Sequence, residues 1–266
     1  MPTATNHGVR LPYERDGPTD AETVVFVEGL GYGRWMWRWQ RRALSDYDTI
    51  LPDNRGTGEA DTPAGPYTVG EMAQDLAAVL DDAGVETAHV VGASMGGMIA
   101  QQFALEYGRA DSLTLLCTTP GGPEAVPTPE ETQRRIFDVP EDYDERERRR
   151  YKMAPAMTDS FLRDNEDLVE RIVDWRLDSD AGEQALAWQA AAVEAFDVHD
   201  RLDEIRVPAL VVHGTADRVV PVENGRLLAE ALPNADSREL DGAPHLLFIE
   251  RAEVVNEALR GFLADV

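Results

Sequence analysis

One stretch near the middle of the chain constrains its fold more than any other. Residues 89–91 form a short apolar run typical of a buried strand, and residues 98–105 form a run that favours a helix. Between them stands the pattern G-x-S-x-G, with Ser94 at its centre. Glycine two residues to either side lets strand and helix pass close together. We therefore expect Ser94 to lie exposed on a sharp, strained turn, beside the unpaired N–H groups of a helix N-terminus.

The charge of the chain is strongly unbalanced. Asp and Glu total 50 against 25 Lys and Arg, for a formal charge of −25, and Lys152 is the only lysine. Such a surface repels nucleic acids and anionic membranes, so we expect neither as a partner. At about 1 M salt the Debye length falls to roughly 3 Å and self-repulsion is screened. We therefore expect adaptation to a salty cytoplasm, as in haloarchaea. A GC-rich genome, the alternative, accounts for the missing lysines but not for the excess of acids.

Several classes of protein are not expected from this sequence. It has no apolar run of 18 or more residues, which a transmembrane helix requires, and residues 1–6 do not resemble a signal peptide. We therefore expect a cytoplasmic protein. The single cysteine, Cys117, lies in an apolar run and is expected to pack in the core. The His and Cys residues lack metal-ligand spacing, and residues 29–33 do not match G-x-G-x-x-G, so neither a metal nor another cofactor is expected.

The order of predicted elements indicates one α/β domain with an insertion. Strands alternate with helices at both ends of the chain, which predicts βαβ units and a mostly parallel central sheet flanked by helices. From Thr118 to about Arg206 the pattern becomes helical and highly charged, and the alternation then resumes. We interpret residues 1–120 and 207–266 as the core domain and residues 121–206 as an inserted helical cap.

Two more side chains follow strands at the edge of the sheet where Ser94 is expected. Asp217 comes after the apolar run 208–214, and His245 comes after the probable strand 237–240. Catalytic groups gather at the carboxyl ends of parallel strands. A serine hydroxyl needs a base to become nucleophilic, and the base needs an orienting acid. The order Ser94, Asp217, His245 is the one expected for an α/β-hydrolase.

On these residues, the chain resembles the α/β-hydrolase superfamily over nearly its whole length. The resemblance rests on four motifs in the family's order, at residues 53–58, 92–97, 213–217 and 243–245. It is closest to small esterases, enol-lactone hydrolases and cofactor-free haloperoxidase-like members. It implies the α/β-hydrolase fold, with Ser94 as nucleophile, His245 as general base and Asp217 as the acid that orients it.

The glycine-rich loop 29–33 is the natural second part of such a site. It follows a probable strand and can turn its N–H groups inward, which makes the Leu30 N–H a candidate oxyanion donor. The resemblance adds the N–H of Met95. Many family members carry His-Gly where this chain has Glu28-Gly29. Glu28 could shift the pH profile of the site, although we favour a satisfied structural acid.

The motifs together predict a cofactor-free hydrolase that cleaves a carboxylic ester of a small molecule through a Ser94-His245-Asp217 triad and an acyl-enzyme. Trp175 and Trp188 in the cap, with Trp37, are candidates for the wall of the substrate pocket.

Three alternatives stay open. One is a lactonase similar to 3-oxoadipate enol-lactone hydrolase, in which Arg134, Arg135 or Arg176 would bind a substrate carboxylate. The second is a carbon–carbon bond hydrolase with the same triad. The third is a catalytically silent binding protein of the same fold. The sequence leaves the oligomeric state and the natural substrate undetermined.

Overall fold

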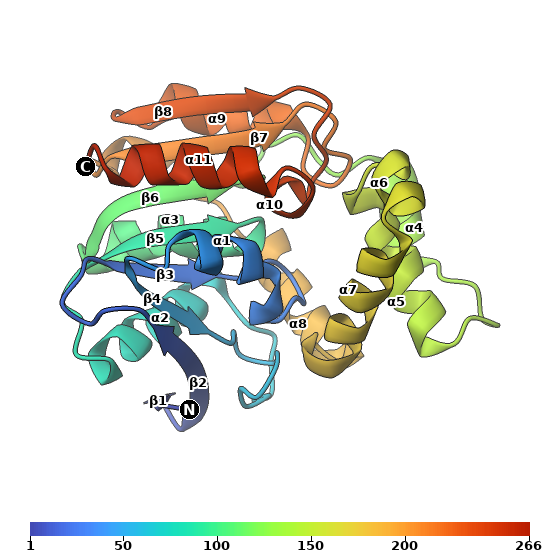
Figure 1. Ribbon diagram of the computed structural model, residues 1–266, viewed down its shortest axis with the longest axis horizontal. Coiled ribbons are helices and arrows are strands. Elements are labelled where there is room, and N and C mark those ends of the chain that lie inside the picture. Colours follow the sequence, from blue (N-terminus) through green and yellow to red (C-terminus); the bar gives the residue numbers. More distant parts are fainter.

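A single eight-stranded sheet forms the centre of the molecule (Figure 1). The computed structural model describes the backbone of residues 1–266 and every side chain except that of Phe137. The strand order is β1-β2-β4-β3-β5-β6-β7-β8; β2 runs antiparallel to both of its neighbours, and the other adjacent pairs are parallel. The predicted mostly parallel sheet is therefore confirmed. The strands are β1 Thr3–Asn6, β2 Val9–Asp16, β3 Thr23–Val27, β4 Asp48–Pro52, β5 Ala88–Ala93, β6 Ala110–Leu116, β7 Ala209–Gly214 and β8 Ala235–Leu240.

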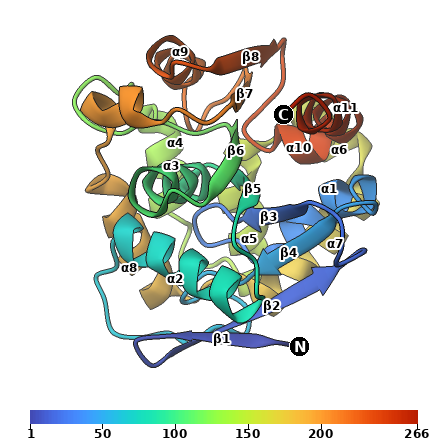
Figure 2. The same cartoon turned by 90° about the vertical axis from the view of Figure 1, so that its left-hand side faces the viewer.

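Helices cover both faces of the sheet, with α2, α3 and α9 on one side and α1 and α11 on the other (Figure 2). None of the described helices is both long and apolar enough to cross a membrane. The helices of this core are η1 Arg34–Trp37, α1 Arg38–Ala43, α2 Val69–Asp82, α3 Met95–Tyr107, α9 Val222–Ala231, α10 Leu247–Glu250 and α11 Ala252–Leu263.

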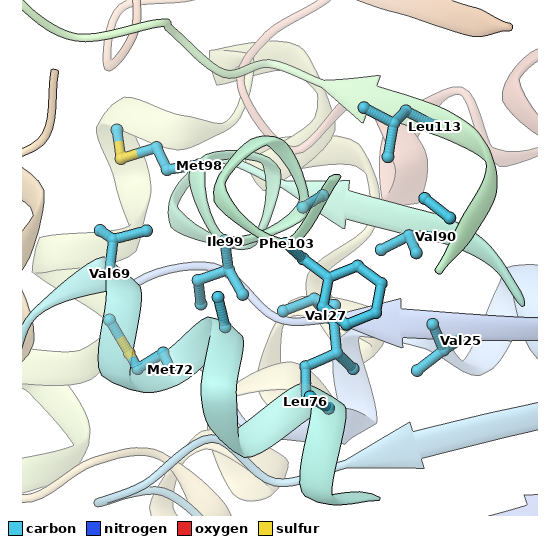
Figure 3. Packing of buried hydrophobic residues seen from close by; sticks show 14 of the residues in the cluster. Val25, Val27, Val69, Met72, Leu76, Val90, Met98, Ile99, Phe103 and Leu113 are labelled. Atoms are coloured by element: carbon cyan, nitrogen blue, oxygen red, sulfur yellow. The ribbon is translucent and has the colours of Figure 1, made fainter. Parts of the chain in front are cut away.

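The face that carries α2 and α3 is packed around Phe103 (Figure 3). This ring is fully buried among Val27 and Val90 of the sheet and Leu76 of α2. Removing a buried phenylalanine side chain typically costs about 3–5 kcal/mol of stability. The packing holds α3 firmly against β5, and so fixes the turn between them that carries Ser94.

Residues 121–206, which we call the cap, form helices beyond the carboxyl ends of the strands (Figure 1). The chain leaves the core and returns to it at neighbouring points, because the Gly122 N–H donates to the carbonyl of Phe196 (3.2 Å) and the Val198 N–H donates to that of Pro120 (3.0 Å). Residues 199–204 follow this return and pack against α9 of the core. The helices of the cap are α4 Glu130–Phe137, α5 Glu145–Met153, η2 Ala154–Ala156, α6 Asp159–Asp164, α7 Glu166–Ser179, α8 Glu183–Glu194 and η3 His199–Glu204.

Candidate active site

Ser94 lies on a strained turn between β5 and α3. Its backbone has φ 55° and ψ −119°, a region that non-glycine residues rarely adopt. A Cβ atom on Gly92 would lie 2.2 Å from the carbonyl oxygen of Gly96, and one on Gly96 would lie 2.0 Å from that of Val27. Only glycine permits these approaches, which explains the spacing of the G-x-S-x-G pattern.

Hydrogen bonds from β6 and the residues after it support this turn. The Ser94 N–H donates to the Leu116 carbonyl at 2.9 Å, and the Thr118 hydroxyl donates to the Ser94 carbonyl at 2.6 Å. Thr118 is fully buried. Thr118 could not be found from the sequence, because a threonine 24 positions from the turn carries no local signal of the contact.

The structure brings Asp217 and His245 together in the two loops that follow β7 and β8. His245 Nδ1 lies 2.8 Å from Asp217 Oδ2, while Asp217 Oδ1 accepts the N–H groups of Val219 (2.8 Å) and Val220 (2.9 Å). His213 Nε2 lies 3.3 Å from the same Oδ2 atom. Burial alone would raise the pKa of Asp217, but the charge of His245 and hydrogen bonds from both histidines lower it to about 2. Because the ionised carboxylate accepts a hydrogen bond from His245 Nδ1, the other ring nitrogen, Nε2, can accept a proton from a nucleophile.

Ser94 and His245 line one cavity of about 130 Å³. Among the described residues no hydrogen bond joins the two side chains, and such catalytic bonds often form fully only in the complex with substrate. Most of the other lining residues are apolar; they are Gly29, Leu30, Tyr32, Met36, Ala93, Ile136, Ala156, Leu186, Val219, Leu246 and Phe248. This arrangement suits a small, largely apolar substrate beside the serine.

Two backbone N–H groups beside the serine have no acceptor among the residues that the structure describes. They belong to Leu30, which lines the cavity, and to Met95, the first residue of α3. Unpaired N–H groups of this kind can bind a developing oxyanion. The geometry thus fits the donors expected from the sequence.

The loop that carries Leu30 is held by the cap. The Gly31 N–H donates to Gln189 Oε1 at 2.8 Å, and Gln189 Nε2 donates to the Arg55 carbonyl at 2.9 Å. The Ala181 N–H donates to the Gly31 carbonyl at 2.9 Å. Gln189 is fully buried, so α8 fixes this loop from 158 residues away in the sequence.

The three tryptophans proposed for the pocket wall lie outside this cavity, which corrects that assignment. Trp37 is fully buried in the core, Trp175 lines a separate hollow with Arg34, and Trp188 packs on loop 63–67. Large rings gain most from contact with other side chains, and all three have aromatic neighbours. These neighbours are Phe26 and Phe248 for Trp37, Trp35 and Trp39 for Trp175, and Tyr67 for Trp188.

Glu28 differs from the satisfied structural acid that we expected. It is fully buried at the end of β3, and neither carboxyl oxygen has a hydrogen-bond partner among the described residues. Burial, reinforced by the nearby charge of Asp53, raises the pKa of Glu28 well above its usual value. The site beside loop 29–33 therefore favours the neutral form of Glu28, and the expectation that this acid has hydrogen-bond partners was wrong.

Two cations line the otherwise apolar cavity. Of the three arginines considered from the sequence, Arg176 lines it, whereas Arg134 is exposed beside Glu130 and Arg135 lies over the Tyr151 ring. The second cation is Lys152, which the sequence analysis did not assign to the site. The sequence feature that could have drawn attention to Lys152 is that it is the single lysine in a chain that otherwise uses arginine.

One group of potential metal ligands occurs among the described residues. The nearest ligand atoms of Cys117, Asp217 and His245 lie within 4.8 Å of one another. Two of them already bond each other, and burial raises the pKa of the Cys117 thiol well above its usual value. A protonated thiol is a poor ligand, so the cluster fits a histidine–carboxylate pair with Cys117 packed against it better than a metal site.

Comparison with known proteins agrees with this geometry. A family model described as alpha/beta hydrolase fold matches residues 22–252, and the chain belongs to this family. It is 33% identical over 270 residues to a protein of Azorhizobium caulinodans assigned as a carbamate hydrolase, RutD. The alignment covers 100% of this chain and 99% of that protein.

Two further similarities point in the same direction. The chain is 33% identical over 271 residues to the 2-hydroxy-6-oxononadienedioate/2-hydroxy-6-oxononatrienedioate hydrolase of Paraburkholderia phymatum, with 97% of this chain and 92% of that protein covered. The crystal structure of the enol-lactonase from Burkholderia xenovorans LB400 matches with a TM-score of 0.87 and 28% identity, over 99% of this chain and 100% of that one. The names of these relatives support a hydrolase with a small-molecule substrate.

Proposed function

We propose that this protein is a serine hydrolase that cleaves a carboxylic ester of a small molecule. The observation that carries the proposal is one cavity lined by Ser94, His245 and Leu30, with the unpaired N–H groups of Leu30 and Met95 at the serine. Preorganised donors of this kind stabilise the charge that develops on the carbonyl oxygen. Loss of one such donor raises the barrier by about 2.7–4 kcal/mol.

The proposed reaction has two halves. Ser94 Oγ bonds to the carbonyl carbon as His245 Nε2 takes the hydroxyl proton, and that proton then leaves with the alcohol as the ester bond breaks. Water next attacks the acyl-enzyme and gives a proton to His245, which passes that proton to Ser94 Oγ as the acyl–oxygen bond breaks and the acid is released. Asp217 stays ionised throughout and stabilises the charged imidazole.

The size of the cavity points to a short substrate. The cavity beside Ser94 and His245 has a volume of only about 130 Å³ and is mostly apolar. We therefore expect short acyl chains to be preferred over long ones.

Other substrates of the same machinery are the main alternatives. Arg176 in the cavity wall suits an enol-lactone that carries a carboxylate. Carbon–carbon and carbamate bonds, named for two relatives, would use the same nucleophile. The non-enzyme alternative is a catalytically silent binding protein, in which Ser94, His245 and Asp217 would take part in no reaction.

A series of p-nitrophenyl esters, from acetyl to dodecanoyl in about molar KCl, tests the proposal. We expect turnover to be fastest for the short acyl chains and to fall by about 10⁶-fold in Ser94→Ala. A folded wild type that cleaves no ester would contradict the ester assignment, and lactones would then be tested. Turnover that survives Ser94→Ala would contradict the role of the serine.

We also infer that the chain works in a salty cytoplasm and that residues 121–206 act as a cap on the core formed by residues 1–120 and 207–266. The formal charge of −25 supports the first inference, and the bonds between Gln189 and loop 29–33 support the second. We expect the melting temperature to be clearly higher in about 2 M KCl than in about 0.1 M KCl, because salt screens the self-repulsion. Equal values would contradict the salt adaptation.

A further inference from the structure

Lys152 lines the cavity that holds Ser94 and His245, and its ammonium has no partner among the described residues. It lies in the last turn of α5 and is half-buried. Among the residues that the structure describes, its ammonium makes no hydrogen bond and no ion pair within 4.0 Å. Glu183 acts on it only at longer range. An ammonium removed from water costs free energy unless an anion compensates it.

Two of the neighbouring cations, Arg149 and Arg176, each have a carboxylate partner, unlike Lys152. Arg176 donates to Asp180 at 2.6 Å and lies over the ring of Tyr32, and Arg149 donates to Glu145 at 3.0 Å. Burial, with the nearby charges of Arg148, Arg149 and Arg176, lowers the pKa of Lys152 despite the opposing effect of Glu183. The cavity wall therefore carries an excess positive charge at this point. In a chain of net charge −25, it is a local site where an anion would be attracted.

We propose that Lys152 binds a carboxylate of the substrate, so that the natural substrate is a short ester or lactone that also carries a carboxylate group. This inference rests on the proposed function and narrows its substrate class. The small, mostly apolar cavity requires the two groups to belong to one compact molecule. The simplest such substrate is a half-ester of a small dicarboxylic acid. The carboxylate supplies the counter-ion that the protein does not, and it orients the ester carbonyl toward Ser94.

A pair of isosteric methyl esters isolates the charge. Monomethyl succinate carries a carboxylate where methyl succinamate carries a neutral amide, and methanol release reports the hydrolysis of both. We expect the wild type to favour the anionic ester in kcat/KM, and we expect Lys152→Met to reduce this preference by about 10- to 100-fold. The loss should appear mainly in KM for monomethyl succinate, with methyl succinamate nearly unaffected, and Lys152→Arg should restore part of it.

The control is Arg163→Met, which makes the same change of charge in the cap. Arg163 lies on α6, is mostly exposed and pairs with Asp164. Its removal should leave the preference for the anionic ester unchanged. An equal loss of that preference in Arg163→Met would overturn the proposal in favour of a general charge effect. Loss of activity toward both esters alike in Lys152→Met would also overturn it, because it would indicate a structural role.

A binding measurement tests the subsite without substituting Lys152 and without turnover. Since the chain has one lysine, reductive ¹³C-methylation of the Ser94→Ala protein labels Lys152 and the N-terminus, and the dimethylated amine keeps its charge. We expect saturable shifts of the lysine signal with monomethyl succinate but not with methyl succinamate. Equal responses to both, or to neither, would overturn the proposal. If the wild type cleaves neither ester, the proposed ester hydrolysis fails while this titration still decides the subsite.

Discussion

The two sides of the catalytic cavity are built in different ways. On the core side, Ser94 takes its geometry from glycines two residues away and from the adjacent strand β6. On the opposite side, loop 29–33 is fixed by Gln189, 158 residues from Gly31 in the sequence. The serine turn is therefore a local structure on a rigid sheet, whereas loop 29–33, which carries the proposed oxyanion donor Leu30, depends on how the cap docks. Substitutions on the core side should therefore slow the chemical step directly. Substitutions on the cap side should slow it by displacing loop 29–33 from the reacting group.

The largest effect among the variants that sharpen this comparison is expected on the core side, from Asp217→Asn. The amide cannot hold His245 in the form that takes the serine proton, so kcat should fall by about 10⁴-fold. The variant should stay folded, which circular dichroism would verify. Retention of more than about a tenth of the wild-type kcat would contradict the assignment of Asp217 as the orienting acid.

A smaller effect is expected on the cap side, from Gln189→Leu. The change leaves the Gly31 N–H and the Arg55 carbonyl buried without partners, at about 1–3 kcal/mol each. A displaced Leu30 N–H should then lower kcat by about 10- to 100-fold. The matched variant Gln189→Glu keeps the acceptor for Gly31, so its kcat should fall less. A wild-type kcat in Gln189→Leu would show that the loop holds its shape without the cap.

The smallest effect concerns stability, at Glu28. The pKa of this buried acid lies well above its ordinary value of 4.5, so the fold favours the neutral form while the unfolded chain ionises. Stability is thus complete below a pH of about 4.5 and falls as the pH rises toward the folded-state pKa. Glu28→Gln removes this loss and should raise the melting temperature by about 2–4 °C or more near pH 8, but not near pH 4. Identical pH slopes for the two proteins would refute this explanation.

The core side of the site could be predicted from the sequence because its signals are local. Ser94, Asp217 and His245 each follow a strand within a short motif, and parallel strands bring their ends to one edge. The Leu30 N–H on the opposite side could be proposed as a donor for a similar reason, because loop 29–33 follows β3. The fold class was predictable for the same reason, since alternating strands and helices leave few arrangements.

The cap side could not be predicted, because helical patterns do not reveal which residues of a helix face a cavity. Trp175 and Trp188 are equally conspicuous in the sequence of the cap, yet one lines a separate hollow and the other packs on Tyr67. Gln189 is indistinguishable in sequence from any helical glutamine, and only the docking of α8 on loop 29–33 shows its role. Lys152 was visible as the only lysine, but its place in the cavity depends on how α5 packs against the core.

The most direct test of the central claim is the intact mass of the protein after treatment with a fluorophosphonate, which reacts with serines activated by a base and an oxyanion hole. We predict one adduct per chain, located on Ser94 by peptide mapping, and none in Ser94→Ala. Replacement of His245 by alanine should slow labelling to the background rate. A folded wild type that stays unlabelled, or that is labelled at another residue, would contradict the account.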